Sequence, residues 1–180
     1  MQLVLVRHPQ PDIAPGICYG RTDIPASPTA VAQVAAVLRE AGLPGVLPVF
    51  ASPLARCVQL VRELGSPCTY DPRLAEMDFG AWEMCAWDAI ARSDVDAWAA
   101  DLLHYRPGGG ETVLEVARRV AAFRDDLRQG GHPGALLICH AGTMRLLSAL
   151  HAGGSIEEAA LLAASSAHRI AYGGIIVLND

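Results

Sequence analysis

Apolar residues along this chain alternate between short continuous runs and stripes with helical spacing. The runs predict buried strands at six places, which are residues 2–6, 46–51, 68–70, 134–139, 168–172 and 175–178. The last two segments meet at Gly173-Gly174 and are expected to form a terminal hairpin or two adjacent strands. Between the runs, apolar residues three, four and seven positions apart predict amphipathic helices.

Capping residues mark where these helices begin. The predicted starts are Ser27 before Pro28, Ser52 before Pro53, Thr112 with Glu115 three residues later, and Ser155. A further helix is expected to follow the segment His140-Ala141-Gly142. The first two helices are expected to end at Gly42 and Gly65, since glycine commonly terminates helices.

Strands that alternate with helices are typical of a layered α/β fold. We expect a three-layer α/β/α architecture around a mostly parallel mixed sheet of about six strands. The chain has 180 residues, of which 52% are hydrophobic, so it can form one domain over residues 1–180 with its own core. In such sheets ligands bind beyond the carboxyl ends of the strands, and candidate chemistry is therefore sought there.

The charge and the cysteines narrow the classes of function. The formal net charge is −5, whereas a general nucleic-acid binder needs a basic face. Five cysteines are scattered without a CxxC pair, which favours reduced thiols and a cytoplasmic location. No apolar run reaches 18 residues and no secretory signal is evident, so no membrane association is expected.

Cationic side chains follow three of the predicted strands. They are Arg7 and His8 after the first strand, Arg56 one turn into the helix after the second, and His140 after the fourth. If these strands are parallel neighbours, the four side chains meet at one edge of the sheet. Guanidinium groups match phosphate oxygens in shape and charge, and the helix starts near Ser52 and Gly142 add backbone N–H groups. The pattern predicts an anion site that suits phosphate.

An imidazole at position 8 adds reactivity to such a site. A neutral imidazole carries a lone pair at pH 7, so His8 can attack phosphorus and form a labile phosphohistidine. The arginines and His140 would stabilise charge on the phosphoryl oxygens. The leaving alkoxide needs a proton, for which Glu76 in the segment RLAEMDFG is the preferred donor. Its rivals for that role are Asp78, Glu83 and Glu111.

The motifs of this chain resemble those of a known family. The order seen in the histidine phosphatase superfamily, the phosphoglycerate-mutase-like proteins, is matched by LVRHP, GRTDIPAS, ASPLARCVQL, RLAEMDFGAWE, PGGGETV and CHAGTMR. The resemblance covers nearly the whole chain and implies a six-stranded mixed sheet flanked by helices, with no metal and no cofactor. It also implies a nucleophilic His8, a proton donor at Glu76, and phosphate ligands at Arg7, Arg56 and His140.

Further residues are candidates for contact with substrate. Gly142 begins the helix after His140, and its N–H is a candidate phosphate donor. Tyr19 and Arg21 lie in the long loop and are candidates to reach the leaving group, with a purely structural role in the loop as the alternative. Two carboxylates are expected to orient the arginines or to touch substrate, namely Glu83 and Glu111.

Within the family, the chain is most similar to the branch of the α-ribazole-5′-phosphate phosphatases of cobalamin biosynthesis. That similarity is carried by the stretches RHPQPDIAPGICYGRTDIP and WDAIARSDVDAWAADLLHYRPGGGET. The chain departs from the wider family at Pro9 and Met84, where glycine is usual, and at Cys85, where a polar or basic residue is usual. The last two changes lie near the place where substrate specificity is expected to be set.

The remaining histidines and the tryptophans have plainer interpretations. Surface or supporting roles are expected for four histidines that lack the paired spacing of a zinc site, namely His104, His132, His151 and His168. Core packing is expected for Trp82, Trp87 and Trp98. The alternative for the tryptophans is that one of them lines a pocket for an aromatic leaving group.

The preferred function is a metal-independent phosphomonoesterase that works through a phosphohistidine intermediate. Three alternatives stay open: a phosphatase of another small phosphomonoester, a phosphoglycerate-type mutase, and a non-catalytic phosphoryl-binding scaffold. The expected partner is a small-molecule phosphomonoester rather than a nucleic acid or a membrane. A homodimer is the alternative to a monomer.

Overall fold

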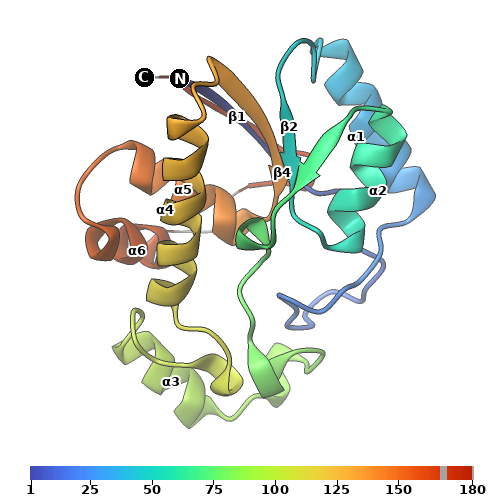
Figure 1. Cartoon of the computed structure of the whole chain (residues 1–180). Helices are drawn as coiled ribbons and strands as arrows, with labels where there is room; N and C mark the ends of the chain where they lie inside the picture. Colours follow the sequence, from blue (N-terminus) through green and yellow to red (C-terminus); the bar gives the residue numbers. More distant parts are fainter. Residues whose placement is uncertain (167–169, 180) are drawn as a thin grey trace.

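The central sheet holds five strands in the described part of the chain. The computed structural model describes residues 1–166 and 170–179. The strand order is β3-β2-β4-β1-β5, and the strands are β1 (Gln2–Arg7), β2 (Val49–Ala51), β3 (Cys68–Tyr70), β4 (Gly134–Cys139) and β5 (Ile175–Leu178) (Figure 1). The first four strands run parallel, and β5 pairs antiparallel with β1. The predicted mixed, mostly parallel sheet is confirmed.

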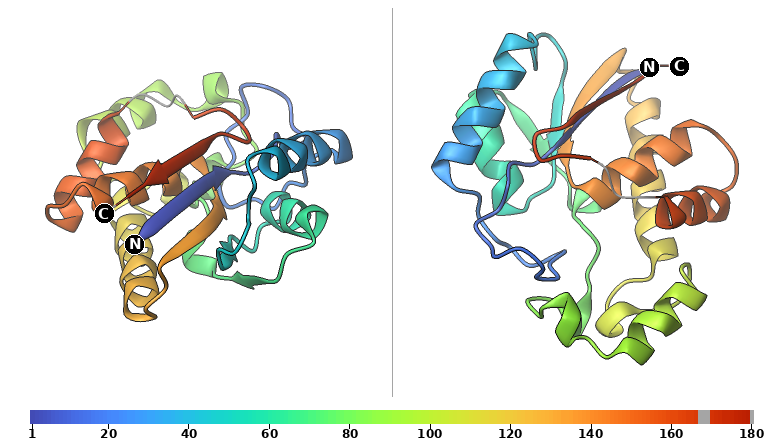
Figure 2. Two further views of the ribbon diagram at one scale, coloured as in Figure 1. Left: turned by 90° about the horizontal axis from the view of Figure 1, so that it is seen from above. Right: turned by 180° about the vertical axis from the view of Figure 1, so that it is seen from behind.

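Helices cover both faces of this sheet, which confirms the predicted three-layer architecture. One face carries α1 (Pro28–Glu40) and α2 (Ala55–Leu64), and the other carries α4 (Val113–Gln129), α5 (Ala141–His151) and α6 (Ile156–Ser165) (Figure 2). The remaining helix, α3 (Arg92–Ala100), lies beyond the carboxyl ends of the parallel strands (Figure 1). Among the described residues, no helix has the length and apolarity needed to cross a membrane.

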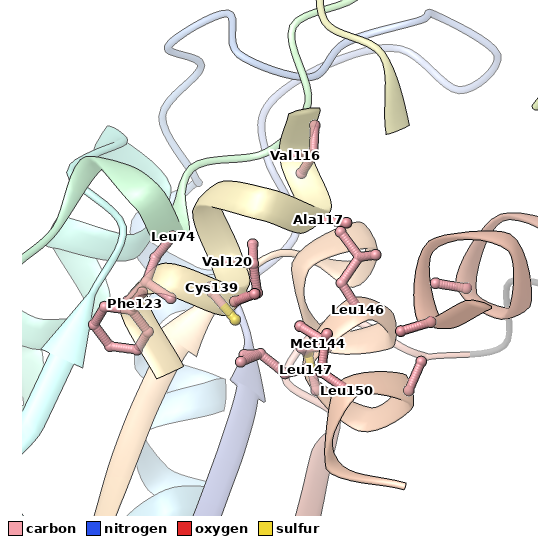
Figure 3. Packing of buried hydrophobic residues seen from close by; sticks show 14 of the residues in the cluster. Leu74, Val116, Ala117, Val120, Phe123, Cys139, Met144, Leu146, Leu147 and Leu150 are labelled. Atoms are coloured by element: carbon pink, nitrogen blue, oxygen red, sulfur yellow. The ribbon is translucent and has the colours of Figure 1, made fainter. Parts of the chain in front are cut away.

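The central strands are apolar on both faces because helices bury both. In β1, Val4 and Val6 pack in the cluster under α1 and α2, while Leu3 and Leu5 pack in the cluster under α4, α5 and α6. Figure 3 shows part of the second cluster, which includes Leu74, Val120, Phe123, Cys139, Met144 and Leu147. Burying one such side chain contributes roughly 1.5–3 kcal/mol. The core thus fixes β1, the strand whose end carries the first two candidate site residues.

Three of the predicted helix caps are confirmed. The Ser27 hydroxyl accepts a hydrogen bond from the first turn of α1, and Thr112 with Glu115 forms a full capping box at the start of α4. Ser155 takes part in a second capping box at the start of α6. The end of α2 is also as predicted, because Gly65 adopts a left-handed conformation with φ +66°.

The predicted cap at Ser52 is wrong. α2 begins at Ala55, whose backbone N–H donates to a carboxylate oxygen of Asp23 at 2.5 Å. Ser52 Oγ instead lies 2.8 Å from Nε2 of His140. The hydroxyl is therefore engaged by a residue far along the chain, and no local pattern could show this.

Two predicted strands also differ in the structure. β2 begins at Val49 rather than at residue 46, because Val46 is fully exposed and Pro48 has no N–H to give to a ladder. The predicted strand 168–172 is not found: residues 167–169 lie outside the described residues, and 170–172 are not in a strand. The described sheet accordingly has five strands instead of six.

The connection from β3 to α4 is less regular than the rest, as the sequence indicates. It holds α3 and four 3₁₀ turns, which are Pro72–Leu74, Gly80–Trp82, Trp87–Ala89 and Pro107–Gly109. A Cβ added at Gly80 would lie 2.2 Å from the backbone oxygen of Gly108, and a Cβ added at Gly108 would lie 2.2 Å from that of Phe79. Glycine is thus required for the close packing of these two turns.

Candidate active site

The carboxyl ends of β1 and β4 bring two histidines together. Arg7 is in register with Cys139 on the neighbouring parallel strand, and a histidine follows each strand. The His8 backbone N–H donates to the Cys139 carbonyl at 3.0 Å. The ring centroids of His8 and His140 are 5.0 Å apart. The expectation that these strand ends meet is confirmed.

A cavity of about 540 Å³ lies at this edge of the sheet, and its lining contains two groups of residues. The polar group consists of Arg7, His8, Tyr19, Arg56, Glu76, Gly142, Arg145 and Tyr172. The apolar group includes Phe79, Trp87, Trp98, Val113 and Leu146. A cavity of this volume, mostly apolar with a few polar groups, is typical of a small-molecule site.

The His8 side chain is held as a neutral imidazole with one defined tautomer. Its Nδ1 lies 2.6 Å from the carbonyl oxygen of Pro9, and a carbonyl can only accept, so Nδ1 carries the hydrogen. Nε2 consequently keeps its lone pair. Burial is the main cause that lowers the pKa of His8 to about 3, with further lowering by the charges of Arg56 and Arg7, while the Pro9 hydrogen bond opposes them. The ring is uncharged and nucleophilic at pH 7.

Two guanidinium groups flank this imidazole and are anchored by backbone carbonyls. Fully buried Arg56 donates from Nη1 to Thr22 O at 2.9 Å and from Nη2 to Gly20 O at 2.6 Å. Arg7 donates from Nη1 to Ile170 O at 2.5 Å. The Nε of each arginine is buried without a hydrogen-bond partner, and no carboxylate of the described residues forms an ion pair with either. Both guanidinium groups therefore bring positive charge to one cavity without an ion-paired carboxylate among the described residues.

His140 supplies a neutral donor beside His8. Ser52 Oγ accepts from the Leu54 N–H at 3.3 Å, so its hydroxyl hydrogen is free to be donated to Nε2 of His140 at 2.8 Å. When the Ser52 hydroxyl is the donor in this pair, Nδ1 of His140 carries the ring hydrogen, and this atom has no hydrogen-bond partner among the described residues. Burial, followed by the neighbouring His8 and Arg56, holds the pKa of His140 well below its usual value. His140 thus offers an N–H group without a positive charge.

Glu76 comes from the irregular connection and is held by two backbone N–H groups. Its Oε1 accepts from Met77 at 3.1 Å, and its Oε2 accepts from Gly142, in the first turn of α5, at 3.0 Å. A Cβ added at Gly142 would lie 2.4 Å from Oε1. Glycine at this position lets the carboxylate approach the start of the helix, so Gly142 both lines the cavity and fixes Glu76.

Two tyrosines link the long loop to the segment before β5. The Tyr19 and Tyr172 hydroxyls lie 2.8 Å apart. The Tyr172 ring lies under the Arg7 guanidinium, 3.9 Å from Cζ to the ring centroid, and its centroid is 5.6 Å from that of His8. The Tyr19 ring is 5.5 Å from Cζ of Arg56. The pair therefore forms one wall around both guanidinium groups.

The structure does not bring Arg21, Glu83 or Glu111 into the lining of this cavity. The Arg21 side chain is 56% exposed and lines a second cavity of about 160 Å³. Glu83 accepts hydrogen bonds from the backbone N–H of Arg21 at 2.8 Å and from that of Thr22 at 2.6 Å. Burial alone would raise the pKa of Glu83, but these bonds and others from Thr22 and Phe79 lower it. Glu111 pairs with Arg119 instead of touching the cavity. Their contacts are those of residues that hold loops.

Sequence reasoning missed two residues that line the cavity, and it also missed Arg119, which binds backbone carbonyls at and before Glu76. Tyr172 has no local signal, because its partner Arg7 lies at the other end of the chain. Arg119 was hidden in an ordinary amphipathic helix. Arg145 lines the cavity and donates to carbonyls at the end of α6, and burial lowers its pKa, opposed by the charge of Glu76. It lies three residues after Gly142 in the motif CHAGTMR, and that helical spacing could have identified it.

The three tryptophans have different surroundings in the structure. Trp82 is buried and does not line the cavity, which fits core packing. Trp87 and Trp98 line the cavity with their indole rings nearly parallel, 8° apart in plane and 6.4 Å apart in centroid. Phe79 packs edge-on against both. Two tryptophans therefore line the cavity, whereas the alternative expected one, and an aromatic leaving group stays a prediction.

The family model of the Histidine phosphatase superfamily (branch 1) matches residues 3–172. The chain belongs to this superfamily, whose members include phosphatases and mutases. It is a hydrolase of the phosphoric monoester class, as are its relatives with phosphatase names. The family membership predicted from the motifs is confirmed.

Relatives of known structure and sequence share this fold. The alpha-ribazole phosphatase of Shigella flexneri superposes with a TM-score of 0.79 at 27% identity, covering 98% of this chain and 89% of that chain. The putative phosphoserine phosphatase 2 of Hydrogenobacter thermophilus is 29% identical over 165 residues, 87% of this chain and 81% of that protein. The adenosylcobalamin/alpha-ribazole phosphatase of Escherichia coli is 34% identical over 99 residues, 53% of this chain and 48% of that protein. The chain spans 46% of the length of three mycobacterial relatives.

Proposed function

We propose that this chain is a metal-independent phosphomonoesterase that transfers a phosphoryl group first to His8 and then to water. One observation carries the proposal. A buried, neutral imidazole with a free Nε2 lone pair lies beside two guanidinium groups that no described carboxylate neutralises. A phosphate charge about 4 Å from one guanidinium gains roughly 4 kcal/mol at an effective dielectric near 20. Positive charge already fixed in place needs no metal ion to hold the phosphate.

In the first step, Nε2 of His8 attacks phosphorus and the bond to the ester oxygen breaks. Arg7, Arg56 and the N–H of His140 stabilise the charge on the three non-bridging oxygens. Glu76, in its protonated form, gives a proton to the leaving oxygen. The products are an alcohol, a phosphohistidine and the Glu76 carboxylate.

In the second step, the Glu76 carboxylate takes a proton from water, and the resulting hydroxide attacks the phosphohistidine. The N–P bond breaks, inorganic phosphate is released, and the electron pair returns to Nε2. The hydrogen bond from Nδ1 to Pro9 keeps the ring in the same tautomer through both steps. The enzyme is then restored to its starting protonation state.

α-Ribazole-5′-phosphate is the proposed substrate. Its leaving group is a nucleoside with an apolar bicyclic aromatic base, which matches a cavity lined by Phe79, Trp87 and Trp98. Aromatic side chains favour offset or edge-to-face contacts with such rings, worth about 0.5–1.5 kcal/mol each beyond burial. The names of the Shigella flexneri and Escherichia coli relatives point to the same substrate.

The test is hydrolysis by protein treated with EDTA. Release of phosphate from α-ribazole-5′-phosphate should survive EDTA and vanish in His8→Ala, and kcat/KM should exceed that for ribose 5-phosphate, which lacks the base. Full activity of His8→Ala would overturn the mechanism. Equal kcat/KM for the two esters would overturn the choice of substrate and favour another small phosphomonoester.

The two remaining alternatives are separated by simple assays. A phosphoglycerate-type mutase would convert 3-phosphoglycerate to its isomer in the presence of a trace of bisphosphate, and the apolar lining of the cavity argues against so polar a substrate. A phosphoryl-binding scaffold would form no acid-labile phosphohistidine after mixing with substrate. A cytoplasmic location and the choice between monomer and homodimer stay predictions.

A further inference from the structure

The proton donor of the proposed reaction comes from a segment without regular structure. Glu76 lies between the 3₁₀ turns Pro72–Leu74 and Gly80–Trp82. The N–H groups that bind its carboxylate fix only the end of the side chain. Something else must hold the backbone from which that side chain extends.

One arginine of α4 binds this backbone at three carbonyls. Arg119 donates from Nη1 to the carbonyls of Arg73 and Ala75 at 2.7 Å each, and from Nη2 to that of Glu76 at 3.2 Å. Its side chain is 19% exposed and does not line the main cavity. All three acceptors lie at or just before Glu76.

Glu111 binds both Arg119 and the backbone on the other side of Glu76. Its carboxylate accepts hydrogen bonds from Nε and Nη2 of Arg119, at 2.9 Å and 3.0 Å. Its Oε2 also accepts a hydrogen bond from the backbone N–H of Asp78 at 3.0 Å. A bidentate pair of this kind has a fixed geometry that two separate charges lack. The residues on either side of Glu76 are therefore bound to one ion pair, which is formed by Arg119 of α4 and by Glu111, just before that helix.

We propose that Arg119 and Glu111 form a positioning pair, which sets the Glu76 carboxyl at the distance needed to protonate the leaving oxygen. The inference rests on the proposed function and adds to it residues that touch neither substrate nor His8. A pair that only stabilised the fold would affect every substrate alike. A pair that positions the acid matters most where the leaving group needs a proton.

Leaving groups of different acidity make that distinction. p-Nitrophenolate departs without protonation, whereas the alkoxide of glycerol 2-phosphate does not. The quantity to compare is kcat/KM, because it reports the first phosphoryl transfer and excludes hydrolysis of the phosphohistidine. In Arg119→Gln and in Glu111→Gln, kcat/KM for glycerol 2-phosphate should fall on the order of 10–10²-fold. The fall for p-nitrophenyl phosphate should be about twofold.

Controls keep the outcome interpretable. Arg118 is the neighbouring arginine of the same helix, its side chain is 60% exposed, and its Nη2 lies 3.8 Å from Oε1 of Glu157. Arg118→Gln should leave both activities unchanged. Arg119→Lys keeps the charge but cannot reach a carboxylate and three carbonyls together, so it should show the same selective loss. If Arg119→Gln does not fold, the lysine variant and Glu111→Gln carry the test.

The result is also separable from the fate of the proposed mechanism. Glu76→Gln should show the largest selective loss on glycerol 2-phosphate. If it does and the Arg119 and Glu111 variants lose both activities equally, the positioning role is overturned and the mechanism stands. If Glu76→Gln itself shows no selectivity, the assignment of Glu76 as the acid fails.

Discussion

Met84 occupies a backbone conformation that glycine would adopt at lower cost. Among the described residues it is the one non-glycine with a left-handed φ, at +65°. Its N–H donates to the Cys18 carbonyl, and the Cys18 N–H donates to the Cys85 carbonyl, both at 2.8 Å. Met84 and Cys85 thus lie opposite the single residue Cys18. This arrangement is a β-bulge, and the first position of such a bulge usually holds a glycine in the left-handed conformation. The sequence departure at Met84 is therefore a departure in backbone energetics.

The magnitude follows from comparing glycine with alanine at this position. A left-handed conformation costs an L-residue roughly 1–2 kcal/mol. Glycine loses about 0.5–1 kcal/mol more than alanine through backbone entropy. Because both variants remove the Met84 side chain, its lost contacts cancel, and Met84→Gly should be more stable than Met84→Ala by about 0.5–1 kcal/mol.

Thermal and urea unfolding of the two variants measure this difference, which corresponds to roughly 1–4 °C in Tm for a chain of this size. Val37 in α1 is a matched control, since it is 52% exposed against 53% for Met84. There the order should reverse, with Val37→Gly about 1 kcal/mol less stable than Val37→Ala. A Met84→Ala variant as stable as Met84→Gly would refute the reasoning from backbone strain.

Three further outcomes are expected. Below pH 6.5 the unfolded chain gains a proton at His8 that the folded chain does not bind until about pH 3. The free energy of unfolding should therefore decrease as the pH is lowered from 6.5 towards 3, and it should decrease less steeply in His8→Asn. Identical slopes of the two proteins in urea titrations at several pH values would contradict this. Tyr172→Phe should keep the ring under Arg7 and a nearly unchanged KM, whereas Tyr172→Leu should raise KM about threefold to tenfold; equal KM values would exclude the contact as a contributor. Gly142→Ala should displace the Glu76 carboxyl and depress kcat/KM for alkyl esters more than for p-nitrophenyl phosphate; a uniform loss in steady-state assays would point to misfolding instead.

Local signals in the sequence were sufficient for most of the secondary structure. The caps at Ser27, Thr112 and Ser155 depend on atoms within one helical turn, so their prediction needed no knowledge of the fold. Ser52 shows the opposite case, because a distant histidine competes for its hydroxyl. The run at residues 46–51 was apolar enough for a strand, yet Val46 projects into solvent.

The candidate site divides along the same line. His8 and His140 could be placed because parallel strands end at one edge, which is a rule of topology and not of contact. Arg119 could not be found, since its three carbonyl acceptors are more than 40 positions away. Backbone acceptors carry no signature in a sequence, whatever residue supplies them.

The position of β1 has a consequence for how the protein is made. β1 precedes the other strands of the sheet along the chain, but both of its neighbours, β4 and β5, come from the last third of the sequence. On the ribosome His8, the proposed nucleophile, therefore lacks β4 until Cys139 has emerged and the neighbouring β5 until Leu178 has emerged. The complete site should therefore form only late in translation, after β4 and β5 have both paired with β1.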